Sequence, residues 1–442
     1  MTFPDSQRSL DDKAFEPEAG SLQEKVIGLA TVSAYSAASS DDANVGLHEF
    51  DIAKQSGVRV TPEQNRRIAK KIDLFLLPMF CIAQGLGFVD KTAVNYGNLY
   101  GMTKTLHISG NQFSWLASGE STNRGIKEPT LSRRTLDTAF YLGYLVGNYP
   151  DSWLLQRYPA GKVLSITTLL WATIMITTPA CTNFASIMAN RFFLGVLEAI
   201  ITPGMTLMTS IWYAQSEVPF RHLAWYSFNG WAGIFGGFLA YGVGHIEHPQ
   251  IALWKYIFLI LGGMCVVFAV ILWFFFPDSP VKARFLTNEE KILAVKRVAE
   301  AKVGVKNTQF KWYQVKHALV DPTTWILFVA TIATQIPNGI ITNFSTVLIK
   351  STLLNTVSSA VQIVSMLIAG WILRIITMTA CNVTCIIAAA SLVYLPSDQR
   401  WNHLVSYWFT SFETVGFALS LVMVANNRLV VFSFRVYRNK GF

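Results

Sequence analysis

The chain has 442 residues, of which 52% are hydrophobic and 14% are charged, and its formal net charge is +9. This apolar content is higher than a soluble domain of such length needs, and the basic residues do not gather in one patch that would indicate nucleic-acid binding. The apolar residues instead form ten segments, most of them close to the roughly 20 residues that cross a bilayer. These predicted spans are 72–90, 138–149, 163–180, 185–212, 224–244, 254–276, 323–345, 358–373, 375–395 and 403–425.

Residues 1–60 are rich in Ser, Asp, Glu and Ala and contain no early apolar stretch of the kind found in a signal peptide. We expect a disordered cytoplasmic tail here. Thr61, Pro62 and Glu63 then have the residue types of a helix start and lead through basic residues into the first span.

Basic residues predict the orientation of the chain. Nine Lys and Arg lie between 282 and 316, whereas the loops at 181–184 and 245–253 have none. The positive-inside rule places the N-terminus in the cytoplasm, and we expect a plasma-membrane protein. The predicted organisation is a six-helix half at 61–276, a cytoplasmic central loop at 277–322, a partial second half at 323–425 and an atypical basic tail at 426–442. Two sets of spans around a long loop are typical of a transporter with two halves and a substrate site between them.

Four ionisable residues lie within or beside the apolar spans: Asp90, Lys91, Arg191 and Glu198. A charge at the centre of a membrane helix costs about 2.5–3.5 kcal/mol on insertion scales. Charges retained at that cost usually face a water-filled path, so the sequence favours a transport function.

Arg191 and Glu198 are seven residues apart, which puts them on one face of a helix and about 10 Å apart along its axis. A guanidinium group suits a carboxylate ligand, and a desolvated Glu can exchange a proton. One residue would therefore hold an organic anion while the other carries a proton. Alternatively, both residues form structural ion pairs with other helices, or Arg191 extends to the membrane interface.

Several motifs resemble those of the fungal allantoate-permease-like proteins, which belong to the anion:cation symporter family of the major facilitator superfamily. The resemblance covers about 62–425. Its motifs are the segment 90–96 (DKTAVNY), the segment 147–150 (GNYP) with Leu154, Arg157, Pro159 and Lys162, the segment 191–195 (RFFLG) with Glu198, Trp212 and Tyr213 with Glu217 and Arg221, and the segment 336–344 (IPNGIITNF). It implies an all-α polytopic membrane protein of the major facilitator fold, here with about ten transmembrane helices.

The resemblance also implies roles for individual residues. Lys91 would attract or bind the anion, with Asp90 beside it in proton coupling. The alternative for this pair is a capped helix end at the outer interface. Asn95, Asn338 and Asn343 can hydrogen-bond a substrate, or equally bind neighbouring helices together. Arg157, Lys162, Glu217 and Arg221 lie in short cytoplasmic loops, where opposite charges can pair when an inner gate closes. Arg157 and Lys162 alternatively serve only the positive-inside rule.

Two departures from the family pattern stand out. Residues 119–137 hold seven charges and a proline, and they interrupt the expected second helix, leaving only 138–149. We expect this insert to loop out of the membrane, and its origin as a translated intron is one hypothesis. After the tenth span the resemblance stops, and we expect two helices of the second half to be missing.

The sequence thus predicts a proton-coupled importer of a small organic anion such as allantoate, ureidosuccinate, nicotinate or pantothenate. It predicts neither an enzyme nor a metal or cofactor site; the proton gradient supplies the energy, and the protein is expected to be a monomer without a nucleic-acid partner. One alternative is a truncated remnant that does not transport. A lipid- or receptor-type membrane protein is the weaker alternative, because the family motifs occur in order.

Overall fold

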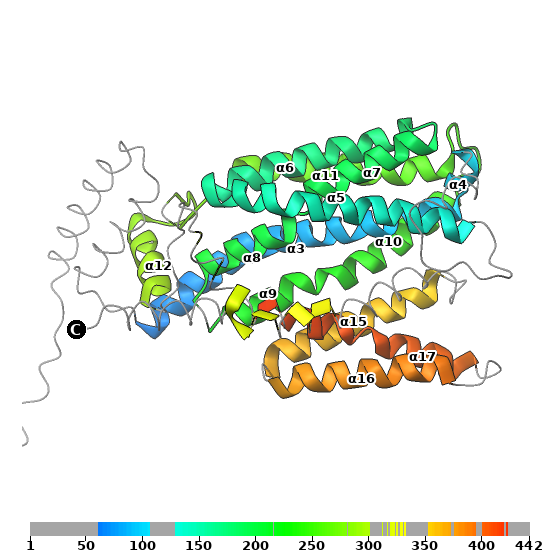
Figure 1. The fold of residues 1–442 in the computed structure, drawn as a ribbon. Coiled ribbons are helices and arrows are strands. Elements are labelled where there is room, and N and C mark those ends of the chain that lie inside the picture. The colour runs from blue at the N-terminus through cyan, green and yellow to red at the C-terminus, as the bar shows by residue number, and fades with distance from the viewer. Residues whose placement is uncertain are drawn as a thin grey trace, which may run out of the picture.

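The computed structural model describes residues 61–106, 129–214, 216–280, 282–300, 352–372, 375–394, 400–419 and 421–422, with scattered positions between 312 and 332. Over these residues the fold is helical, and no strand occurs among them. Figure 1 shows a bundle of long helices that run side by side. Both predicted tails, and most of the predicted seventh span, lie outside the described residues.

The first helix of the bundle is α3, Pro62–Leu99, with 38 residues. Thr61 and Gln64 form a capping box at its start, which confirms the helix start predicted at Thr61. At 1.5 Å per residue the helix is about 57 Å long, so it extends well beyond a bilayer core of about 30 Å. The predicted end of this span at residue 90 is wrong, because the helix continues for nine more residues.

The second helix, α5, runs from Pro129 to Arg157 and has 29 residues. The helix therefore extends beyond the predicted span 138–149 at both ends. Pro150 lies inside the helix, and residues 129–137 of the predicted looped-out insert form its first turns. The remainder of that insert, 119–128, lies outside the described residues.

The other helices of the first half follow with short connections. They are α6 (Ala160–Thr177), with a 3-10 turn at Thr178–Ala180, α7 (Phe184–Glu198), α8 (Ile201–Trp212), α9 (Val218–Tyr226), α10 (Phe228–Gly244) and α11 (Leu253–Phe275). The predicted span 185–212 is thus two helices, separated just after Glu198. Pro203 explains the separation, since a proline lacks an N–H and its ring crowds the carbonyl four residues earlier, that of Ala199.

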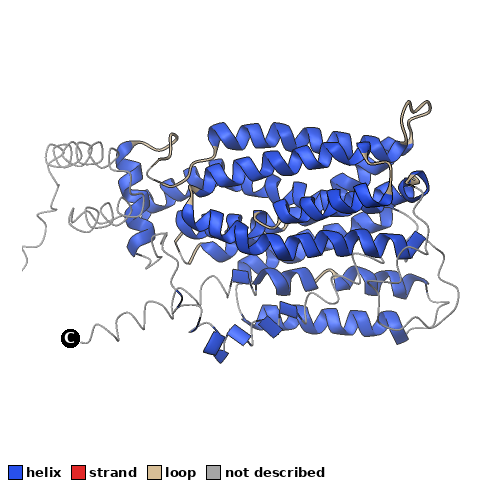
Figure 2. Ribbon diagram, turned by 45° about the horizontal axis from the view of Figure 1, so that its top comes forward, coloured by secondary structure: helices blue, strands red, loops and turns tan. Residues whose placement is uncertain are grey.

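Two layers of helices flank α3 (Figure 1). On one side, α5 packs against α7 and α6 packs against α11, while α10 contacts α3 directly. On the other side lie α15 (Thr352–Ile372), α16 (Ile375–Tyr394) and α17 (Arg400–Thr410), and the rotated view in Figure 2 shows the same parallel arrangement. The two sides meet where α10 packs on α15.

Glycines allow this close approach of α10 and α15. A Cβ atom at Gly230 would lie 2.7 Å from the carbonyl oxygen of Ser359, and one at Gly233 would lie 2.5 Å from the Ser359 hydroxyl. At Gly236 a Cβ atom would meet the ring of Tyr96 at 3.1 Å. The glycine-rich stretch of α10 thus serves helix packing.

The outward faces of the bundle are apolar. Leu145 is 71% exposed, Val267 62% and Phe274 63%. Four helical segments of the described chain are long and apolar enough to cross a membrane: Pro62–Leu99, Ala160–Ala180, Phe184–Trp212 and Leu253–Phe275. Large apolar side chains that point away from a packed core suit a surface that faces lipid.

We expect replacement of Gly147 by Leu to prevent folding. A Cβ atom there would lie 2.5 Å from the backbone oxygen of Val196 on α7, and this backbone cannot move without displacing the helix that carries Arg191. Overpacking a core costs about 1–3 kcal/mol, and more where backbone is hit. Size-exclusion chromatography of a fluorescent fusion should show loss of the monodisperse peak. Gly263→Leu is the control, because a Cβ atom at Gly263 meets nothing within 4 Å; equal behaviour of both variants would contradict this account of α5–α7 packing.

Candidate functional site

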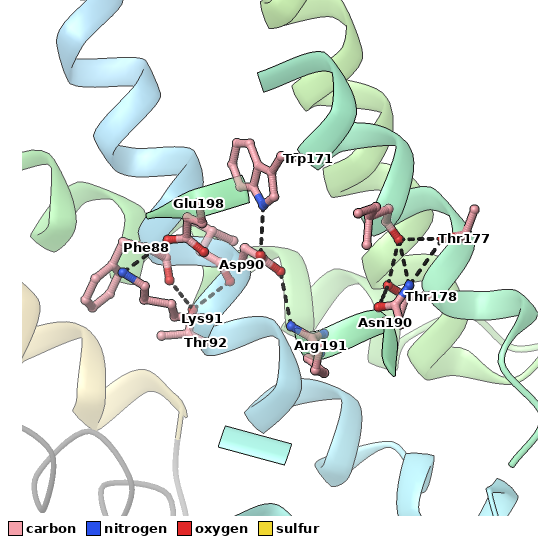
Figure 3. A network of polar contacts seen from close by, with 12 residues as sticks. Phe88, Asp90, Lys91, Thr92, Trp171, Thr177, Thr178, Asn190, Arg191 and Glu198 are labelled. Atoms are coloured by element: carbon pink, nitrogen blue, oxygen red, sulfur yellow. Dashed lines mark hydrogen bonds and ion pairs between the residues drawn. The ribbon is translucent and has the colours of Figure 1, made fainter. Parts of the chain in front are cut away.

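Charged side chains from α3 and α7 meet inside the first half of the bundle (Figure 3). The guanidinium Nη1 of Arg191 lies 3.5 Å from Oδ1 of Asp90, and the two side chains are 2% and 0% exposed. The indole Nε1 of Trp171 on α6 donates to Oδ2 of Asp90 at 3.1 Å. Each oxygen of this buried carboxylate therefore has a donor, which offsets part of its desolvation cost.

A second ion pair lies beside the first. Nζ of Lys91 is 3.1 Å from Oε1 of Glu198, and Glu198 is 3% exposed whereas Lys91 is 33% exposed. The ammonium group also faces the rings of Phe140 and Tyr144 on α5, at 5.9 and 5.6 Å from their centroids. We refer to Asp90, Lys91, Arg191 and Glu198 as the charged layer. It contains two cations and two anions, so its formal charge is zero.

The order of these residues along the two helices explains the pairing. Asp90 and Lys91 are consecutive in α3, so their side chains point about 100° apart around its axis. Arg191 and Glu198 lie two turns apart on one face of α7, as predicted, and both are buried. The alternative that Lys91 sits at a helix end is wrong, because α3 continues to Leu99.

Hydrogen bonds fix the start of α7 next to Arg191. Asn183 and Ser186 form a capping box at its N-terminus. Asn190 accepts a hydrogen bond from the Thr178 hydroxyl at 3.0 Å and donates to the backbone oxygen of Ile174 at 3.0 Å (Figure 3). These contacts tie α7 to the end of α6 and so position Arg191 within the bundle.

The charged layer retains unused hydrogen-bonding capacity. Nε and Nη2 of Arg191, and Oε2 of Glu198, have no hydrogen-bond partner among the described residues. The Arg191 guanidinium lies 5.1 Å from the ring centroid of Phe258 on α11, which supports its plane without using its N–H groups. An adjacent Nε–H and Nη2–H pair is the edge that binds a carboxylate with two parallel hydrogen bonds.

The predicted substrate-binding residues lie in different parts of the chain. Asn95 is half-buried in α3, about one turn after Lys91. Asn338 and Asn343 lie outside the described residues. Sequence reasoning missed Trp171, since one tryptophan among many in apolar spans carries no signal of its role. It also missed the buried Gln84, whose Nε2 donates to Asn229 of α10 at 3.0 Å; an amide inside an apolar span was the available signal.

A second charged cluster lies at the end of the bundle where α3 begins. Arg221 binds Asp73 of α3 with two hydrogen bonds, from Nε at 2.6 Å and Nη2 at 2.9 Å. Oε2 of Glu217 forms ion pairs with Nη1 of Arg221 at 3.7 Å and with Nη2 of Arg297 at 2.9 Å. The predicted gating residues Glu217 and Arg221 are therefore paired with each other, and each has a shorter ion pair with a residue that the sequence did not identify, Arg297 and Asp73 respectively.

The other two predicted gating residues are placed differently. Lys162 Nζ donates to the backbone oxygen of Trp273 at 3.1 Å and lies 4.3 Å from its ring centroid, and its N–H donates to Asp278 at 3.2 Å. These contacts join the start of α6 to the end of α11. Arg157 is exposed at the last residue of α5.

Arg297 belongs to the short amphipathic helix α12, Asn288–Glu300, in the central loop. Thr287 and Glu290 form a capping box at its start. Lys71 Nζ lies 2.6 Å from Glu290. Partial burial favours the neutral form of Glu290, but hydrogen bonds from Lys71 and Thr287 outweigh it and lower the pKa of this carboxyl group. The resulting stabilisation is present above its ordinary pKa and is lost as the pH falls through the lowered value.

We expect Arg297→Ala to release α12 from the bundle. The substitution removes the 2.9 Å contact with Glu217, in which the Arg297 side chain is only 4% exposed, and removing one partner of a buried pair typically costs about 3–5 kcal/mol. Hydrogen exchange at the amides of 288–300 should become faster. Glu289→Ala, at an exposed position of the same helix, is the control and should change exchange much less; unchanged exchange in Arg297→Ala would show that the contact does not hold α12.

Taken together, the apolar outer surface, the parallel long helices and the buried charged layer define a multi-pass membrane protein with paired charges in its interior. A family model described as the Major Facilitator Superfamily matches residues 80–440. The chain belongs to this superfamily, and it is therefore a transporter and not an enzyme.

Known proteins of similar sequence are also named as transporters or permeases. An uncharacterised transporter of Schizosaccharomyces pombe is 34% identical over 381 residues, which cover 83% of this chain and 69% of that protein. The allantoate permease of Saccharomyces cerevisiae is 31% identical over 317 residues, covering 71% of this chain and 54% of the permease. A thiamine pathway transporter of the same yeast is 26% identical over 433 residues, or 91% of this chain and 77% of the transporter.

Solved structures show the same fold. The proton:xylose symporter XylE of E. coli superposes with a TM-score of 0.53 at 14% sequence identity, over 82% of each chain. A bacterial homologue of the human lysosomal transporter Spinster, in an inward-facing form, gives a TM-score of 0.51 at 13% identity over 84% of this chain and 79% of that one. The predicted fold, including about ten membrane helices, is confirmed.

Proposed function

We propose that the protein takes up a small organic anion together with protons, and that it belongs to the anion:cation symporter family. Allantoate, ureidosuccinate, nicotinate and pantothenate are the candidate substrates. The motif resemblance and the 31% identity to an allantoate permease support an organic anion, whereas the similarity to solved structures supports the fold alone.

The observation that carries the proposal is the unused edge of Arg191. Its Nε and Nη2 have no partner among the described residues although the side chain is 2% exposed. A substrate carboxylate bound there would gain two charge-assisted hydrogen bonds without displacing Asp90 from Nη1. Lys91, the more exposed cation of the layer, would attract the anion, and Asn95, Asn338 and Asn343 would contribute hydrogen bonds to its polar groups.

Charge balance supplies a reason for proton coupling. The charged layer is formally neutral, and a monoanion would bring it to a net charge of minus one in a medium of low dielectric constant, which is costly. One proton on Glu198 would restore neutrality and weaken its ion pair with Lys91, freeing that cation for the anion. Asp90 would stay ionised in this scheme, because Trp171 and Arg191 both donate to it.

Other parts of the proposal concern the setting of the protein. The N-terminus would be cytoplasmic and the membrane would be the plasma membrane; the protein would act as a monomer without a cofactor. The paired charges of Glu217, Arg221 and Arg297 would stabilise a closed cytoplasmic side, with Arg157 and Lys162 beside them.

Proteoliposomes test the proposed function. Labelled allantoate and nicotinate should accumulate when the outside is acidic relative to the lumen, and a protonophore should abolish the accumulation. A neutral amide analogue of each acid should not be taken up. Accumulation that ignores the protonophore, or uptake of the neutral amides at the rate of the acids, would refute proton-coupled anion transport.

A further inference from the structure

Glu413 is a buried carboxyl group that the charged layer does not include. It lies in the predicted tenth span, is 3% exposed, and its Oε1 has no hydrogen-bond partner among the described residues. Leaving a buried acceptor unpaired typically costs about 1–3 kcal/mol, and more for a charged group. A side chain maintained at that cost within an apolar span calls for a functional explanation.

The backbone is irregular at the same place. Helix α17 ends at Thr410, and the chain turns at Ser411 and Phe412 before helical structure resumes at Glu413. Through this turn the hydrogen bonds are of the three-residue type, from Ser411 N–H to the Trp408 oxygen and from Phe412 N–H to the Phe409 oxygen. Interrupted membrane helices in transporters commonly line the substrate site.

The face of the tenth span that carries Glu413 is directed at the first half of the bundle. Phe417, four residues later and so on the same face, lies 5.9 Å from Tyr226 of α9 between ring centroids. Glu413 therefore lies on the face of the tenth span that is turned toward α9 of the first half.

Aromatic rings surround Tyr226, whose ring centroid lies 6.3 Å from that of His222 and 5.7 Å from that of Trp225. Asn229 follows Tyr226 by three residues and is hydrogen-bonded to the buried Gln84. Gln84 precedes Lys91 by seven residues, which is two turns or about 10 Å along α3. Asn229 and Gln84 therefore place uncharged hydrogen-bonding groups on α10 and α3, two turns of α3 from Lys91.

We propose that Glu413 accepts a hydrogen bond from an N–H group of the transported anion. This inference rests on the proposed function and narrows it: the substrate carries a carboxylate for Arg191 and, at its other end, an amide or ureide N–H. A carboxyl oxygen without a partner, such as Oε1 of Glu413, can accept a hydrogen bond. Pairing it with an N–H donor removes the cost of the unpaired acceptor, and a ligand that lacks the donor leaves that cost in place.

A matched pair of ligands isolates this contact. β-Ureidopropionate has a terminal ureide, and the keto acid in which methyl and methylene groups replace its two nitrogens has the same length and the same carbonyl and carboxylate. Binding of each to the purified full chain in lipid nanodiscs is measured by calorimetry. We expect the wild type to prefer the ureido acid by about tenfold or more, the value of a hydrogen bond to a charged group.

Two variants then assign the preference to Glu413. Glu413→Leu should abolish it, and Glu413→Gln, which retains a carbonyl acceptor, should reduce it, while affinity for the keto acid stays within about twofold in both because its carboxylate contacts are untouched. Glu289→Gln on the surface of α12 is the control for purification. If Glu413→Leu does not fold, Glu413→Gln still tests the contact, because glutamine preserves the shape of the side chain.

The outcomes separate this inference from the proposed function. If the wild type binds both acids equally, or if the preference survives in Glu413→Gln and Glu413→Leu, Glu413 does not recognise the N–H group although the anion proposal stands. Equal weakening of both ligands would assign Glu413 a packing or proton-carrying role instead. If the wild type binds neither these two acids nor any of the candidate anions, the organic-anion proposal itself fails.

Discussion

Replacing Arg191 by Ala is expected to abolish uptake of the organic anion. The substitution removes the two N–H groups that no described residue uses, and two charge-assisted hydrogen bonds correspond to about a hundredfold or more in affinity. Arg191→Lys should retain the ion pair with Asp90 but not the parallel N–H donors of Nε and Nη2. We therefore expect a large rise in KM with a smaller change in kcat. Initial rates of labelled uptake in proteoliposomes measure both.

Arg191→Ala alone also leaves the buried Asp90 without its cationic partner, and this loss can unfold the protein rather than impair binding. The double variant Arg191→Ala with Asp90→Asn removes both charges and keeps the layer neutral. We expect it to recover the monodisperse folded state and still fail to transport. Recovery of uptake in the double variant would show that Arg191 serves only to neutralise Asp90, which is the structural ion-pair alternative. Arg284→Ala, at an exposed loop position, is the control.

The composition and the apolar segments were sufficient to predict a helical membrane transporter, because span length and charge exclusion are imposed directly by the bilayer. The helix limits were less accurate. Residues 91–99 and 150–157 continue their helices beyond the apolar segments, since a backbone that is already hydrogen-bonded loses little by extending into the polar interface. The break after Glu198 was foreseeable from Pro203, whose missing N–H removes a helical hydrogen bond.

The four residues of the charged layer could be singled out from the sequence, since charges within apolar spans are rare and each needs a partner, and the structure brings them together in two ion pairs. Their pairing could not be predicted, because it depends on the rotation of α3 against α7. The glycines at 143, 147 and 195 allow the close approach of α5 to α7 beside them. Glu413 carried the same kind of signal as Glu198 and was overlooked. It has no family motif around it, and only the structure shows that its helix face is directed at Tyr226.

Glu198→Gln is expected to uncouple uptake from the pH gradient while leaving exchange of the anion intact. Glutamine is neutral at every pH, so it imitates the protonated carboxyl group: the ion pair with Lys91, 3.1 Å in the native protein, is permanently lost and Lys91 is free for the anion. Because no proton can enter or leave the layer, the carrier should equilibrate its substrate and not concentrate it. The wild type should both exchange and concentrate the substrate.

Counterflow and accumulation distinguish these activities in the same vesicles. Glu198→Gln should support counterflow of labelled anion at a rate within about tenfold of the wild type, yet show no accumulation under an imposed proton gradient and no acidification of a luminal dye during uptake. Asp90→Asn is a matched carboxyl variant that unpairs Arg191 instead, and it should lose counterflow as well. Gradient-driven accumulation that persists in Glu198→Gln would show that Glu198 is not on the proton path. Asp90 and Glu413 would then be the carboxyl groups to test, since both are buried within membrane spans. Oε1 of Glu413 also has no hydrogen-bond partner among the described residues.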